Sequence, residues 1–169
     1  MDTLAHHNEK KPFLSKGLIV GILIGILAVA GLVGVLLLRP SVEDQKSAAL
    51  EGAFREGSAE FETLRNDLVF ADKDTIESPN AFGSISMYIQ GEVRNKGTRV
   101  INALEVNVAV IDQKNQVLKD KNVLVVPSQQ RATFEPGEVI PLTTTLDGFG
   151  KKDDRANIRW TVTAVKAAP

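Results

Sequence analysis

The chain has 169 residues, of which 43% are hydrophobic and 24% are charged, with a net charge of -1 and no cysteine. This length predicts one modest domain with accessory segments and excludes a large enzyme. The absence of cysteine excludes a disulfide scaffold, a thiol nucleophile and cysteine-ligated zinc or iron–sulfur sites. Charge is strongly biased only in residues 39–81, which hold 5 basic and 10 acidic residues. No segment has the basic, aromatic-rich composition typical of nucleic-acid binding.

An uninterrupted apolar run occupies residues 17–38, which contain no charged, amide or hydroxyl side chain. At about 1.5 Å per residue, a helix of this length spans roughly 33 Å, enough to cross the hydrocarbon core of a bilayer. The alternative is a cleaved signal peptide, whose apolar region is usually shorter and ends in a small-x-small site. Here three leucines lead directly into Arg39 and Pro40. We therefore expect a transmembrane helix that acts as a signal anchor.

The residues that flank this run indicate its orientation. Lys10, Lys11 and Lys16 lie in the short tail of residues 1–16, whereas the other flank soon becomes acidic. Positive residues near a membrane helix are retained on the cytoplasmic side. We expect a cytoplasmic tail, a single pass through the cell inner membrane and an extracytoplasmic C-terminal portion.

Small residues recur along the apolar run at spacings that allow two helix backbones to approach closely. They are Gly17, Gly21 and Gly25, followed on a neighbouring stripe by Ala30 and Gly34. A homotypic helix pair is one interpretation of this pattern. The other is that glycine is simply common in membrane helices and that this helix is a lone span in lipid.

Residues 39–70 predict an acidic juxtamembrane helix. Ser41 can cap a helix whose first turn is acidic, and helical character continues to about Asn66. Apolar residues recur at spacings of four and three if Gly57 occupies one position of the seam. The seam residues are Leu50, Phe54, Phe61, Leu64 and Leu68. The pattern is too short for a typical coiled coil, so the seam packs either on the chain's own domain or on a partner.

Residues 71–81 lack periodicity and predict a linker, and beyond them the apolar pattern becomes alternating. Alternation with one apolar face indicates half-buried antiparallel strands. Five strands are expected, over residues 85–93, 104–110, 117–126, 139–146 and 158–165. In the last of them, one face holds Ile158, Trp160, Val162 and Ala164. The fold class is therefore mainly β, a small antiparallel sandwich formed by residues 82–169 and expected to fold as a soluble protein when expressed alone.

Two turns support this assignment. Asp112 to Asn115 joins two strands as a hairpin in which the asparagine takes the left-handed conformation. Pro136-Gly137 suits a type II turn before the next strand.

The domain also carries a family pattern. Gly91, Val93, Asn95 and Gly97 alternate along one segment, a later alternating strand ends in Asp112, and Pro136-Gly137-Glu138 precedes another strand. Over residues 85–165 the chain resembles the FxLYD-type immunoglobulin-like domains attached to single membrane anchors in bacterial envelope proteins. At the motif that names the family, this chain has Val108, Val110 and Ile111 before the aspartate, so both aromatics are lost. The resemblance implies an immunoglobulin-like architecture and extracytoplasmic interaction, not an activity.

No catalytic, cofactor or metal site is expected. Both histidines, His6 and His7, lie in the N-terminal tail without the further ligands of a zinc site. Catalysis by carboxylates alone would have to use one or more of the aspartates of the domain, which are Asp112, Asp120, Asp147, Asp153 and Asp154. Turn aspartates, however, usually hydrogen-bond to the backbone. Three of these aspartates could hold calcium in the loop 147–155, but its basic residues favour a solvated loop.

Two functions remain open. The first is a membrane-anchored interaction or structural module of the bacterial envelope, held off the bilayer by the acidic helix and binding another envelope protein or a copy of itself. The second is a sensor or carrier for a small ligand. The domain has one Trp and one Tyr, which leaves few side chains for an apolar small-molecule pocket, so we favour the interaction module.

Overall fold

The computed structural model describes residues 16–38, 41–81, 83–128 and 130–168. The chain divides into two compact units, Met1–Val42 and Glu43–Pro169. The first unit holds α1 (Lys16–Leu38), whose window Gly17–Gly34 has a mean hydropathy of 2.6 and no buried residue. The expected helix is therefore present, and it is long and apolar enough to cross a membrane. The tail residues His6, His7, Lys10 and Lys11 lie outside the described residues.

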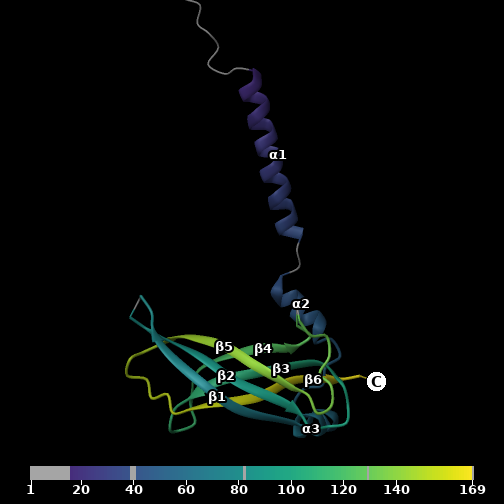
Figure 1. Cartoon of the computed structure of the whole chain (residues 1–169), viewed down its shortest axis with the longest axis vertical. Helices are drawn as coiled ribbons and strands as arrows, with labels where there is room; N and C mark the ends of the chain where they lie inside the picture. The colour runs from purple at the N-terminus through teal and green to yellow at the C-terminus, as the bar shows by residue number, and fades with distance from the viewer. Residues whose placement is uncertain (1–15, 39–40, 82, 129, 169) are drawn as a thin grey trace, which may run out of the picture. The chain divides into compact units, whose positions relative to one another are not determined.

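The second unit is a sandwich of two three-stranded antiparallel sheets (Figure 1). One sheet has the order β1 (Leu68–Pro79), β2 (Ile85–Asn95) and β5 (Val139–Phe149). The other has the order β4 (Val117–Val126), β3 (Ile101–Ile111) and β6 (Asn157–Ala167). The predicted mainly β sandwich is confirmed, and each of the five expected strands is present.

The strands form where alternation allows one face to be buried. In β2, burial recurs at every second residue from Met87 to Asn95, and in β5 Ile140, Leu142, Thr144 and Leu146 point inward. The two predicted turns are also present. Asn115 has φ 62° between β3 and β4, and Gly137 has φ 79° in the turn before β5.

The predicted linker of residues 71–81 is wrong, because most of it belongs to β1. This strand pairs with β2 from Leu68 opposite Asn95 to Pro79 opposite Ile85, with a bulge between Asp72 and Asp74. After Phe70 every residue of β1 is exposed, so both faces carry polar side chains and no alternation marks the strand. Backbone pairing with β2 defines it instead.

The predicted continuous juxtamembrane helix is also wrong. The segment forms two short helices, α2 (Val42–Ala49) and α3 (Ala59–Asn66), joined by a loop. Gly52 and Gly57 in this loop have φ of 69° and 99°, which breaks a helix and which glycine adopts without steric cost. The Ser58 side chain then caps α3 by accepting a hydrogen bond from the Phe61 N–H at 3.2 Å.

The core lies between the two sheets and is closed at one end by α3. Phe61 and Leu64 of α3 and Leu68 of β1 are buried in the same cluster as Val93, Leu104, Val106 and Phe134. Residues before position 82 therefore contribute both a strand and part of the core. This contradicts the view of residues 82–169 as a complete domain.

Candidate functional site

The segment that leads from the apolar helix into the sandwich is folded back onto one sheet. We call residues 43–57 the strap; they include most of α2 and the loop before α3. Inward-facing residues of β3, such as Leu104 and Val106, belong to the main core. Glu105 lies between them and points to the opposite, outer face, where the strap covers it.

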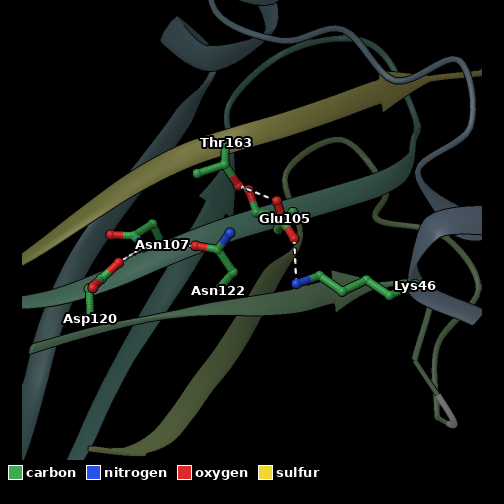
Figure 2. Close-up of polar contacts among 6 residues, drawn as sticks. All are labelled: Lys46, Glu105, Asn107, Asp120, Asn122 and Thr163. Carbon is green, nitrogen blue, oxygen red and sulfur yellow. Dashed lines mark hydrogen bonds and ion pairs between the residues drawn. The ribbon is translucent and has the colours of Figure 1, made fainter. Parts of the chain in front are cut away.

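The strap is joined to this face by an ion pair (Figure 2). The Lys46 Nζ of α2 lies 2.7 Å from Glu105 Oε1, and the Thr163 hydroxyl of β6 donates a hydrogen bond of 2.6 Å to Glu105 Oε2. Glu105 is 3% exposed, so its charge depends on these two partners rather than on water. Alternation along the expected strand of residues 104–110 places Glu105 on the side opposite Leu104 and Val106, but it does not indicate that this side is covered.

These contacts determine the acidity of the Glu105 carboxyl. Burial raises its pKa, but the hydrogen bonds from Lys46 and Thr163, together with the positive charges of Lys46 and Arg55, outweigh burial and leave the pKa lowered. The carboxylate is therefore the form that the folded domain stabilises.

We predict that this pair makes the domain sensitive to acid. Because the folded pKa lies below the ordinary value of about 4.3, Glu105 contributes stability above that value, and the contribution is lost as pH falls through the folded pKa. Glu105→Gln should lower the free energy of unfolding at pH 7, and the gap to the wild type should narrow between pH 5 and pH 3. Denaturant titrations at each pH measure the gap. Glu56→Gln at an exposed position is the control and should leave a small gap throughout. A Glu105→Gln gap that stays constant with pH would contradict the assignment.

A second polar group lies further along the same face. The Asn107 side chain of β3 donates hydrogen bonds of 2.7 Å to Asp120 Oδ2 and to Asn122 Oδ1 of β4 (Figure 2). These are cross-strand contacts between exposed residues, and they link β3 to the charged edge strand β4. Charged side chains on an edge strand oppose pairing with other chains.

Apolar and backbone contacts complete the docking of the strap. Leu50 packs with Ala103 and Ala164 in a small cluster separate from the main core. Phe54 pairs with Val165 of β6, each N–H donating to the carbonyl of the other at 2.8 and 3.0 Å. Lys166 Nζ donates a hydrogen bond of 2.8 Å to the carbonyl of Glu51. The contacts that hold the strap thus include a short bridge, an ion pair, the hydrogen bond from Lys166 and the buried side chain of Leu50.

The predicted apolar seam therefore packs on the chain's own sandwich, although not as one helix. The structure places Phe61, Leu64 and Leu68 in the main core, Phe54 at its margin and Leu50 in the small cluster. The alternative of a seam free to bind a partner is not what the structure shows.

The small residues of α1 are only partly brought together. Gly25 and Ala30 line one shallow apolar groove of about 490 Å³ along the helix. Gly17, Gly21 and Gly34 do not line it, and no heavy atom lies within 4 Å of a Cβ built on any of the three. Pairing of two helices through these residues stays a prediction.

The other notable feature is an open cleft of about 570 Å³ between the edge strands β1 and β6. Met87, Val110 and Ile158 lie on its apolar side, and Asp72, Asp74 and Glu77 are among its polar residues. Volumes of this size are typical of small-molecule sites.

Two links join the sheets across this edge of the sandwich. The Trp160 indole N–H donates a hydrogen bond of 2.5 Å to Asp72 Oδ1, and its ring stacks on Phe70 with centroids 6.2 Å apart. The Arg155 guanidinium donates two hydrogen bonds of 3.0 Å to the Glu77 carboxylate. The hydrogen bonds to Glu77 raise the pKa of Arg155 and outweigh the opposing effect of burial.

The alternating motif of Gly91, Val93, Asn95 and Gly97 has structural roles. A Cβ on Gly91 would lie 2.6 Å from the Trp160 ring, and a Cβ on Gly97 would collide with the Asp67 side chain. Asn95 is 1% exposed; its amide donates to the carbonyls of Arg99 and Phe134, and its oxygen accepts from the Gly97 N–H. Asn95 thus closes the loop between β2 and β3.

We predict that Asn95→Leu lowers the free energy of unfolding by about 3 kcal/mol, because several buried backbone groups lose their partners at once. Denaturant unfolding of the protein measures this change. The same exchange at the exposed Asn66 should cost less than about 0.5 kcal/mol. Equal effects at the two positions would show that the hydrogen bonds of Asn95 contribute little.

The aspartates singled out for carboxylate chemistry are mostly engaged in local hydrogen bonds. Asp112 accepts from the N–H groups of Lys114 and Gln116, Asp153 from that of Gly150, and Asp154 from Gln113. Asp120 accepts from Asn107, and Asp147 is exposed on β5. Among the described residues, no group of three or more His, Cys, Asp or Glu side chains could hold a metal ion.

Comparisons with known protein families, with curated proteins and with solved structures found no match. The resemblance to FxLYD-type domains stays a prediction.

Proposed function

We propose that this chain is a non-catalytic, single-pass membrane protein whose sandwich is a protein-interaction or structural module of the bacterial cell envelope. The observation that supports it is the combination of α1, an apolar helix of 23 residues with no buried residue in its window Gly17–Gly34, with a sandwich whose compact unit begins at Glu43. Only residues 39–42 separate the two. We place the N-terminus in the cytoplasm and the sandwich outside the inner membrane, on the basis of the basic tail.

Single cysteines test this topology, because the chain has no native cysteine. Lys114→Cys lies in the exposed turn after β3, and Thr3→Cys lies in the tail. A membrane-impermeant maleimide applied to cells with a permeabilised outer membrane should label the first and not the second. Labelling of the tail alone would reverse the orientation, and release of the protein by carbonate would exclude an integral span.

Self-association through α1 is a further prediction within this proposal. Replacing Gly21 and Gly25 together by leucine should hold two helix backbones apart while preserving hydrophobicity. The association signal in a two-hybrid assay for membrane helices should fall at least tenfold. Gly31→Leu, on the same helix but outside the small-residue pattern, is the matched control and should keep the signal. An unchanged association signal in both variants would indicate that any self-association occurs through the sandwich and not through α1.

One observation favours the second candidate, a carrier or sensor for a small ligand. The cleft between β1 and β6 has the volume of a small-molecule site and combines an apolar side with carboxylates. A thermal-shift screen of envelope metabolites on the wild type and on Asp72→Asn tests it. Stabilisation that the variant loses would favour the carrier over the interaction module.

A further inference from the structure

We propose that the strap, residues 43–57, is a releasable tether that undocks from the sandwich as a unit while both sheets stay folded, and so sets how far the domain reaches from the membrane. This rests on the proposed function, because reach has meaning only if α1 anchors the chain in a bilayer. Neither sheet includes the strap in its strand order, so its departure removes no strand.

Leu50 is the only buried residue of the strap, and Phe54 packs at the margin of the main core. Leu50 packs in its own small cluster with Ala103 and Ala164, whereas the strands and α3 share the larger cluster. The contacts of the strap outside the small cluster include the ion pair of Lys46 with Glu105, the bridge between Phe54 and Val165, and the hydrogen bond from Lys166 to Glu51. Segments with few buried contacts open locally at lower free energy than the core.

The structure also defines where release would stop. Gly57 has a positive φ, and the next residue, Ser58, caps α3. Two α3 residues, Phe61 and Leu64, are 2% and 1% exposed in the main core, so α3 remains with the sandwich. The glycine next to a fixed helix is the natural hinge.

The change in reach is large. With the strap docked, residues 39–42 connect α1 to the domain and span at most about 14 Å when fully extended. With the strap released, residues 39–58 connect α1 to α3 and span up to about 70 Å. An isolated helix of eight residues is marginal in water, so α2 is expected to lose its helical structure on release. The strap is thus docked on the sandwich in this structure, and it separates the sandwich from α1 only after it undocks.

Hydrogen exchange of the full chain in lipid nanodiscs tests undocking. Amides of residues 43–57 should exchange at least 100-fold faster than those of β3 in the wild type. Lys46→Ala should increase the exchange rate of the strap amides about tenfold further and leave the exchange rate of the β3 amides unchanged. Lys73→Ala, which breaks the exposed ion pair with Glu92 at 3.1 Å, is the matched control and should leave the strap unchanged. Exchange of strap and β3 at equal rates, or acceleration of both by Lys46→Ala, would overturn the proposal.

A disulfide supplies the complementary test. Phe54→Cys together with Val165→Cys places the only two cysteines of the chain opposite each other in the bridge. Oxidation should slow exchange of the strap to the rate of β3, and reduction of the same protein should restore it. Fast strap exchange in the oxidised protein would contradict release as a unit.

A separate measurement gives the distance of the sandwich from the membrane. A fluorescent label is attached to Lys114→Cys, and its quenching by quenchers in the lipid headgroups reports this distance. In Lys46→Ala the label should lie further from the bilayer than in the wild type, and the disulfide should abolish the difference. A strap that exchanges quickly without lengthening this distance would overturn its role as a tether. Failure of the protein to insert into lipid would instead refute the proposed function, and leave the exchange result standing.

Discussion

Residues 43–169 are expected to fold as a soluble β domain without α1, whereas residues 82–169 are expected not to fold. The compact unit begins at Glu43, and the shorter fragment lacks the whole of β1 and α3. It loses the buried side chains of Phe61, Leu64 and Leu68, each worth about 2 kcal/mol or more, which together exceed half of a typical domain's stability. Far-ultraviolet circular dichroism and thermal unfolding of the two fragments measure the difference.

A fragment of residues 58–169 separates the strap from the rest. It keeps α3 and β1 and should fold with a lower melting temperature than residues 43–169, because it loses the contacts of Leu50 and Lys46. A cooperative unfolding transition for residues 82–169, equal to that of residues 43–169, would show that α3 and β1 are dispensable.

Strands β2 to β6 were predictable from the sequence, whereas the edge strand β1, whose residues are exposed on both faces after Phe70, was not. Alternation identified β2, β3, β5 and β6. The turn from Asp112 to Asn115 placed β4 as the hairpin partner of β3, because β4 is exposed over most of its length and does not alternate. Within β6, however, Ala164 packs with Leu50 on the outer side and Val165 enters the main core. The shift follows from a register change opposite Glu105 and Val106, and the sequence carries no signal for such a bulge.

The segment of residues 39–70 illustrates a second limit. Spacing selected the right residues, since Phe61, Leu64 and Leu68 are all buried, but assigned them to one continuous helix. Gly52 and Gly57 have positive φ and interrupt this helix. The weak helix propensity of glycine was the feature of the sequence that could have indicated the interruption.

The partner of Glu105 could not be predicted, because Lys46 lies 59 positions away and local periodicity carries no information on long-range packing. The outward-facing Ala103 and Ala164 are the one sequence signal that could have indicated a covered face. Small side chains let another segment approach a sheet closely.

Phe61→Ala is expected to lower the free energy of unfolding by about 3–5 kcal/mol, the range for a large aromatic side chain removed from a packed core. Phe61 is 2% exposed and shares the main core with Leu64 and Leu68, so the cavity cannot be filled by solvent-facing groups. Denaturant unfolding of residues 43–169 measures the loss. A loss this large should leave the domain marginally stable at 37 °C.

Phe54→Ala is the matched control, because Phe54 belongs to the same predicted seam but is only partly buried at the margin of the core. Its backbone bridge to Val165 does not depend on the side chain, so the loss should stay near 1 kcal/mol. If the seam served a partner instead of the domain, both variants would leave unfolding unchanged and weaken association equally. A large gap in stability between the two variants therefore distinguishes a seam that belongs to the fold from one that belongs to an interface.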